Sequence, residues 1–206
     1  MKPRASSLCA LAVVLLAAGL YVTPALAHAP IKGIGAFYNG LLHPMLVPAH
    51  LLLIVGLGLL LGQHTARTRH YGWFVFVAAF WIGLAVGQAL AMTVPQAILL
   101  ALALLVGGCV ALELPLGAWP LAVVMAVAGV GIGFDSRPDT VQQREIWAVL
   151  SGTAVGGVLL LSYVGGLVVC LARPWQRIGV RVAGSWTAAS AGIVLAFAMA
   201  APRAAG

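Results

Sequence analysis

The chain is dominated by long apolar runs that are separated by short polar connectors. After residue 35 six such runs follow one another, each close to the length of about 20 residues that a helix needs to cross a bilayer. The runs lack the alternation of apolar and polar positions that marks the strands of a membrane barrel. The pattern therefore predicts an all-α polytopic membrane helix bundle of about six transmembrane helices, at Ala36 to Gly62, Gly72 to Ala91, Val94 to Leu114, Ala118 to Gly133, Trp147 to Ala172 and Trp186 to Ala201.

The first residues have the organisation of a secretory signal. Lys2 and Arg4 precede an apolar run over 8–22, and the small-x-small pattern that signal peptidase recognises ends at Ala27. An uncleaved anchor helix is the alternative, but the run is short for a full span and a cleavage pattern follows it. We expect a cleaved signal peptide at 1–27 and a six-helix transmembrane domain at 28–206 that begins with His28.

Composition supports the same class of protein. Apolar residues make up 63% of the chain and charged residues only 7%, a balance that excludes a water-soluble domain of this length. The net charge is +7, but the charges are spread through connectors rather than clustered, which favours membrane topology signals over nucleic-acid binding. We therefore expect the lipid bilayer as a partner and no nucleic acid.

The distribution of arginine predicts the orientation. The connectors on one side of the predicted bundle hold Glu113 and five arginines, namely Arg67, Arg69, Arg173, Arg177 and Arg181. Cytoplasmic connectors of membrane proteins carry an excess of Lys and Arg. An exported mature N-terminus places these connectors in the cytoplasm, so the signal and the charges agree. We expect a multi-pass protein of a bacterial-type inner (plasma) membrane, with both termini periplasmic or extracellular.

Glycines recur at four-residue spacing within the predicted spans. Small residues one turn apart allow two helix backbones to approach closely, so the spacing predicts a tightly packed bundle. The alternative is that the glycines expose backbone along a permeation path. The pairs are Gly58 and Gly62, Gly83 and Gly87, Gly129 and Gly133, and Gly152 and Gly156.

The candidate chemistry lies in the first mature helix, where His43 and His50 are seven residues apart. Seven residues are close to two full turns, so the two side chains share a face. On an ideal helix they would lie about 10 Å apart along the axis, too far for one ion to bond both rings at about 2 Å.

Two prolines between the histidines change that geometry. Pro44 and Pro48 cannot donate the helical hydrogen bonds to the carbonyls four residues earlier, so the segment should be kinked or broken. Broken helices are where membrane proteins build ion sites, and ionisable groups deep in the bilayer are functional candidates. The alternative is a pair of neutral histidines that are hydrogen-bonded to backbone or to neighbouring helices.

These features together resemble the HupE/UreJ family, whose members are taken to be nickel or cobalt permeases. The resemblance rests on His28 at the mature N-terminus, the glycine-rich segment 33–40, and the frame of His43, Pro44 and His50. It implies a transported divalent ion, with His28, His43 and His50 as its ligands. His28 would offer its α-amine beside its imidazole, a combination that suits Ni²⁺ or Cu²⁺.

The chain departs from the family pattern in two places. The HPxxGxDH motif that this resemblance implies corresponds to positions 43–50 here, but its glycine is Val47 and its aspartate, a charged ligand in the family, is Ala49. The family also carries a second motif with His and Glu near the outer end of the fourth helix, where this chain has Asp135. The sequence favours a solvated loop acid at Asp135 over a replacement for the missing ligand.

The sequence therefore predicts a transition-metal permease for nickel or cobalt, with copper as a further candidate and no tightly bound cofactor. The competing hypothesis is a non-transporting membrane accessory or assembly protein on the same scaffold, and the absent aspartate is the feature that most separates the two. We expect no enzyme, because no set of nucleophile, base and orienting group can be assembled from these residues.

Overall fold

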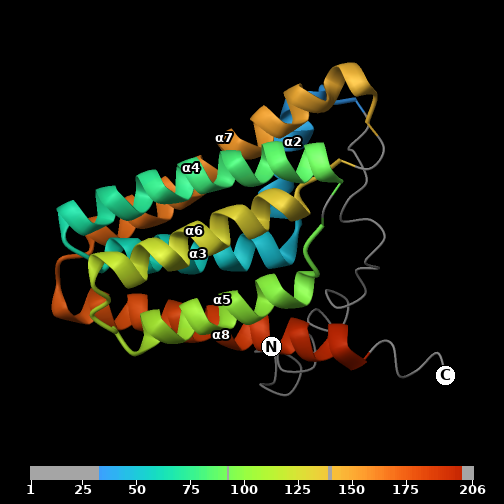
Figure 1. Cartoon of the computed structure of the whole chain (residues 1–206). Helices are drawn as coiled ribbons and strands as arrows, with labels where there is room; N and C mark the ends of the chain where they lie inside the picture. Colours follow the sequence, from blue (N-terminus) through green and yellow to red (C-terminus); the bar gives the residue numbers. More distant parts are fainter. Residues whose placement is uncertain (1–32, 92, 139–140, 201–206) are drawn as a thin grey trace, which may run out of the picture. The chain divides into compact units, whose positions relative to one another are not determined.

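The computed structural model describes residues 33–91, 93–138 and 141–200. The predicted signal peptide and His28 lie outside these residues. The described part is helical throughout and contains no strand (Figure 1). Its elements are α2 (Ala36–Leu46), α3 (Pro48–Gly62), α4 (Ala66–Leu90), α5 (Gln96–Ala111), α6 (Ala118–Asp135), the short 3-10 helix η2 (Gln143–Glu145), α7 (Ile146–Cys170) and α8 (Pro174–Ala200).

The helices have the length and the apolar composition of membrane spans. Within the described residues, α4, α6, α7 and α8 are each long enough to cross a bilayer, and α2 with α3 forms a further span that is bent by 73°. α5 is a shorter apolar helix of 16 residues, about 24 Å long. The predicted all-α membrane bundle is therefore confirmed, although α5 alone does not reach the usual length of a span.

The packing of its neighbours shows why α5 must still run the length of the bundle. Gly72 of α4 lies against Leu121 of α6, and Gly83 further along α4 lies against Val130 and Gly133 further along α6. The two helices therefore run parallel. The chain must return to its starting end between them, and α5 with its flanking residues makes that return.

The last helix begins earlier than the hydrophobic pattern predicted. α8 starts at Pro174 rather than at Trp186, so Arg177 and Arg181 lie within a helix and not in a connector. Long arginine side chains can extend along a helix towards polar surroundings, so they need not end the helix. Arg181 also donates from Nε to the carbonyl of Ala111 at 2.9 Å, which ties this polar start of α8 to the end of α5.

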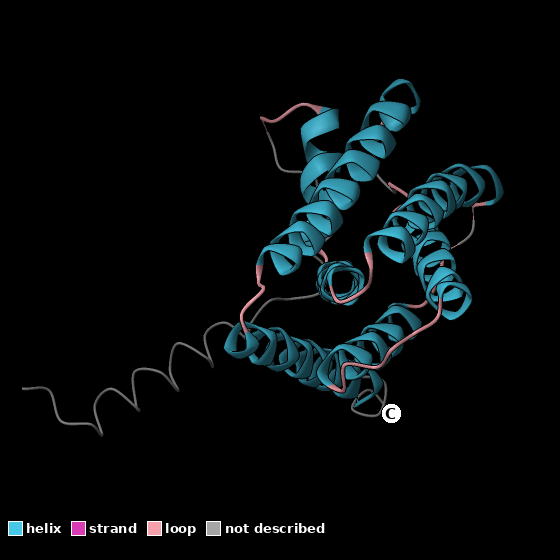
Figure 2. Cartoon of the chain, turned by 90° about the vertical axis from the view of Figure 1, so that its left-hand side faces the viewer, coloured by secondary structure: helices cyan, strands magenta, loops and turns pink. Residues whose placement is uncertain are grey.

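The core of the bundle is centred on α3, which contacts each of the other six α-helices. Leu53, Ile54 and Leu57 are fully buried, and apolar residues surround the helix on all sides. A helix that is apolar all round needs such a buried position. The surrounding helices are joined by short loops, as the view along the bundle shows (Figure 2).

The regularly spaced glycines pack helices together as predicted. A Cβ on Gly133 would fall 2.6 Å from the backbone of Gly83, closer than real Cβ atoms come, so the backbones of α4 and α6 are in direct contact. Gly152 and Gly156 of α7 lie in the same way against the carbonyls of Phe37 and Leu41 in α2. These glycines therefore hold α2 against α7 and α4 against α6.

Candidate metal site

The predicted break in the first span is present and lies at Val47. This residue has an extended backbone (φ −90°, ψ 112°) between α2 and α3. Helical backbone geometry is disfavoured for the residue before a proline. Pro48 is the first residue of α3, where its missing N–H removes no hydrogen bond within the helix. The Val47 N–H still donates to the carbonyl of His43 at 3.2 Å. The prolines thus act locally, and they turn the chain by 73°.

The bend brings the two histidines together. The ring centroids of His43 and His50 are 5.3 Å apart, with an angle of 64° between the ring planes. A straight helix would separate them by about 10 Å. Two imidazole nitrogens that bind one ion at about 2 Å with a tetrahedral angle put their ring centres about 5 Å apart. In the bent segment the two rings are therefore close enough to bind one ion, which they would not be on a straight helix.

An acid from a distant part of the chain contacts one of these rings. Asp135 is the last residue of α6, and its Oδ2 lies 3.0 Å from Nε2 of His50. The His50 side chain is 0% exposed and the Asp135 side chain is 10% exposed. The interpretation of Asp135 as a solvated loop acid is therefore wrong, because its carboxylate is buried against the histidine of α3.

This contact determines which nitrogen of His50 is available. A carboxylate only accepts hydrogen bonds, so His50 donates through Nε2–H, and the lone pair of the neutral ring is on Nδ1. Within the described residues Nδ1 is buried and has no hydrogen-bond partner. Metal-binding histidines commonly donate their other ring nitrogen to a carboxylate, which fixes the ring and raises its basicity. His50 therefore has the arrangement of a metal ligand with its supporting acid.

Position 49, where the family motif has its aspartate, offers no open space for a larger side chain. Ala49 is 1% exposed and belongs to the apolar core, as does Val47. A carboxylate at position 49 would have to be accommodated among packed apolar side chains. In this chain the carboxylate that meets His50 comes from α6 instead.

Other ligating side chains do not join the pair. Within the described part of the chain, no three His, Cys, Asp or Glu side chains are placed to hold a metal ion together. Cys109 and Cys170 are free thiols. His64 uses Nδ1 for a 2.8 Å hydrogen bond to the carbonyl of Leu60. The structure thus brings together His43 and His50 of the three predicted ligands, and adds Asp135 behind His50.

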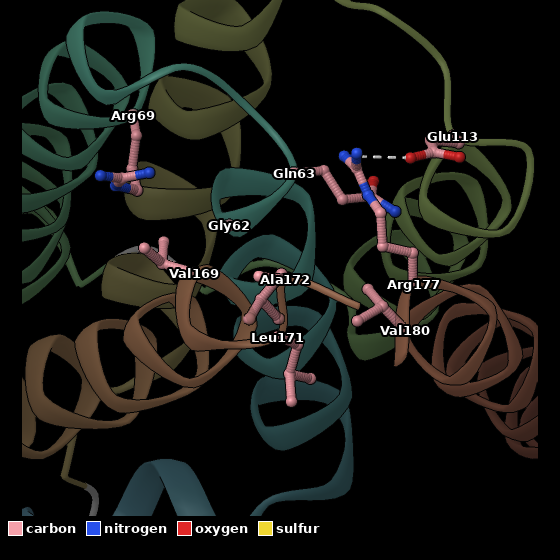
Figure 3. A pocket seen from close by; sticks show the side chains of 10 residues that line it. Gly62, Gln63, Arg69, Glu113, Val169, Leu171, Ala172, Arg177 and Val180 are labelled. Carbon is pink, nitrogen blue, oxygen red and sulfur yellow. Dashed lines mark ion pairs between the residues drawn. The ribbon is translucent and has the colours of Figure 1, made fainter. Parts of the chain in front are cut away.

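A second polar cluster lies where α3 and α5 end and α8 begins. A cavity of about 220 Å³ there is lined by Gln63, Arg69, Glu113 and Arg177, among others (Figure 3). Arg177 Nη2 lies 3.2 Å from Glu113 Oε1, and these side chains are 57% and 39% exposed. Glu113 lies two residues beyond the end of α5.

Apolar residues separate the two clusters. Between His50 and Gln63, α3 carries only apolar residues, and most of them belong to the buried core. The thirteen positions from His50 to Gln63 correspond to about 20 Å of helix. Between the two clusters α3 therefore offers no side chain that could bind a cation.

Comparison with known proteins gives one finding that bears on this site. The family model described as HupE / UreJ protein matches residues 14–195, which is most of the chain. The matched range includes the break between α2 and α3 as well as Asp135. No curated protein and no solved structure matches the chain significantly.

Proposed function

The chain belongs to the HupE/UreJ family of membrane proteins related to nickel and cobalt transport, and on this premise we propose that it is a permease for a divalent transition metal. The apolar helices make it a multi-pass membrane protein. Nickel and cobalt are the proposed cargo, and copper is a further candidate, because imidazole suits all three ions. The ion is the transported substrate and not a resident cofactor.

The observation that carries the proposal is the state of His50. Its Nε2 is committed to Asp135, while its Nδ1 is buried without a partner in the described part of the chain. His64 Nε2 is buried without a partner in the same way, so this state alone does not identify an ion; it leaves the lone pair of His50 Nδ1 open to an ion or a water. With the ring of His43 beside it, a divalent cation is the occupant that this ligand chemistry favours.

The proposed path begins outside and enters at the bend. His28, which lies outside the described residues, would collect the ion with its α-amine and imidazole. His43 and His50 would then receive it, with water completing the coordination. The neutral imidazoles bind the cation without holding it as strongly as a cluster of carboxylates would, and a transported ion must also be released.

The proposed transport includes a movement of the helices. Because α3 carries no ligating side chain between His50 and Gln63, an ion at His50 would advance as the helices around α3 separate. We place the histidine pair towards the periplasmic or extracellular side and the arginine-rich end in the cytoplasm, in an inner membrane with both termini outside. The positive-inside rule supports this orientation.

The competing function is that of a membrane accessory or assembly protein that does not transport. One observation favours it: within the described residues no three ligating side chains converge on one point. Such a protein would retain the buried His50 and Asp135 contact for stability alone. The two functions differ in whether removal of a histidine changes the movement of metal.

Uptake of labelled nickel, cobalt and copper tests the proposal. Cells or vesicles would contain wild type, His43→Ala, His50→Ala or His64→Ala at matched protein level. The last variant is the control, because His64 follows α3 at the opposite end of the bundle and bonds to the carbonyl of Leu60. We expect uptake to be lost in the first two variants and kept in the control. Equal uptake in all variants and in empty membranes would establish that the protein is not a permease.

A further inference from the structure

A groove lies between α4 and α7 near the arginine-rich end of the bundle. It has a volume of about 350 Å³, and its lining includes Trp73 and Phe74 of α4 and Leu161, Gly165 and Gly166 of α7. A Cβ on Gly166 would meet nothing within 4 Å, so this part of α7 faces open space. In a membrane such an apolar groove is filled by lipid.

The groove is basic at one end. Arg69 and His70, in the first turns of α4, belong to its lining, and Arg69 also lines the cavity of Figure 3. Arg69 donates from Nη1 to the carbonyl of His64 at 3.3 Å, and it has no carboxylate partner within the described residues. Its remaining N–H groups form the planar fork that matches the oxygens of a phosphate.

The lining follows the order of groups in a phospholipid. Trp73 is four residues beyond Arg69, so it lies on the same face of α4, about 6 Å further along the helix. Its Nε1 donates to Ser162 Oγ at 2.8 Å, which links α4 to α7 beside the groove. Tryptophan is enriched at the level of lipid headgroups. A phosphate at Arg69 would therefore leave an acyl chain beside Trp73 and the glycines of α7.

We propose that this groove binds one anionic phospholipid, with its phosphate on Arg69 and His70 and an acyl chain over Gly165 and Gly166. The lining contains no Asp or Glu, so it offers no acceptor for the cationic group of a zwitterionic headgroup. Basic side chains at the membrane surface favour lipids of net negative charge. The site is independent of the metal, and its proposed role is to anchor the arginine-rich end in the anionic leaflet.

Native mass spectrometry of the purified, delipidated full chain tests the site. Phosphatidylglycerol and phosphatidylcholine with identical acyl chains would be titrated separately. We expect the first equivalent of phosphatidylglycerol to bind about fivefold or more tightly than phosphatidylcholine, since one basic side chain near the surface contributes that much. Equal affinity for the two lipids in the wild type would overturn the proposal.

Four variants locate the site. Arg69→Gln removes the phosphate partner, and Arg67→Gln is its control, because Arg67 carries the same charge on the same helix outside the groove. Gly166→Leu fills the groove, and Gly108→Leu is its control, because an added Cβ at Gly108 on α5 also meets nothing within 4 Å.

The expected affinities distinguish binding in the groove from a general attraction of anionic lipid to positive charge. Arg69→Gln should lower phosphatidylglycerol affinity about fivefold, and Gly166→Leu should lower the affinity for both lipids, while both control variants behave like wild type. If Arg67→Gln weakens binding as much as Arg69→Gln does, the arginines act only as diffuse charge. If Gly166→Leu binds lipid as well as Gly108→Leu does, the acyl chain does not occupy this groove. Either result contradicts the proposal.

Discussion

The two ends of the bundle each pair a basic side chain with an acid at almost the same distance. His50 and Asp135 are 3.0 Å apart, and Arg177 and Glu113 are 3.2 Å apart. Their surroundings differ, because the first pair is 0% and 10% exposed and the second is 57% and 39% exposed. An exposed ion pair contributes about 0–1 kcal/mol, whereas a buried donor that loses its acceptor costs about 1–3 kcal/mol. Burial, and not contact length, therefore distinguishes a fixed site from a surface contact.

The ends also differ in how the chain builds them. At the histidine end the broken span places His43 beside His50, and the end of α6 places Asp135 behind His50. At the other end Arg69, Arg177 and Arg181 lie in the first turns of α4 and α8. The first arrangement suits a single, partly hydrated cation, and the second suits phosphate groups of lipid.

Removing the acid should have very different consequences at the two ends. Asp135→Ala leaves the buried Nε2–H of His50 without its acceptor, so we expect the free energy of unfolding to fall by about 2 kcal/mol. Glu113→Ala should change it by less than about 1 kcal/mol. Denaturation by sodium dodecyl sulfate in mixed micelles, followed by circular dichroism, measures both. Equal losses would show that burial does not separate the two pairs.

A milder change tests the supporting role of Asp135. Asp135→Asn retains an amide oxygen that can accept from Nε2 of His50 but removes the negative charge behind the ring. We expect nickel affinity to fall about 10–100-fold, as for other groups that orient a metal ligand. Isothermal titration of purified protein gives the affinity. An unchanged affinity would mean that Asp135 serves packing alone.

The bend should matter less than the acid, because tertiary contacts also hold it. Pro48→Ala restores an N–H that can donate to the carbonyl of Pro44, which favours a straighter span and separated histidines. We expect nickel affinity to fall by less than about tenfold, because packing around α3 still favours the bend. Pro174→Ala is the control, since Pro174 likewise begins a helix. Equal effects of the two substitutions would contradict a role for the bend in binding.

The smallest effect concerns the exposed ion pair. Arg177→Gln should lower the free energy of unfolding by less than about 1 kcal/mol, and the difference from wild type should shrink as salt is added. Titrations at low and high ionic strength test both statements. A larger loss that is insensitive to salt would indicate that this pair is as structural as the buried one.

The local features of the molecule could be predicted from the sequence. The apolar runs fix the helices through their length, and Pro44 and Pro48 fix the break through the geometry of the residues beside them. The closeness of His43 and His50 does not follow from the break alone, because it depends on the direction and size of the bend. These depend on how α2 packs against Gly152 and Gly156 of α7.

The contact of Asp135 with His50 could not be predicted in the same way. The two residues are 85 positions apart, and their meeting depends on the placement of α6 beside α3. The segment after Asp135 contains Ser136 and Pro138, residues typical of turns, which favoured the interpretation as a loop. The start of α8 was not predicted, because the arginines in its first turns weaken the hydrophobic pattern of a span.

The most direct test of the account is X-ray absorption spectroscopy of nickel bound to the purified protein. His28→Ala serves as the background, because it removes the proposed N-terminal chelate and leaves the pair at the bend. We predict one bound nickel with two imidazole nitrogens at about 2 Å, and loss of that nickel, or of one imidazole, when His50→Ala is added. Failure of the His28→Ala protein to bind nickel, or an imidazole count that His50→Ala leaves unchanged, would contradict the account.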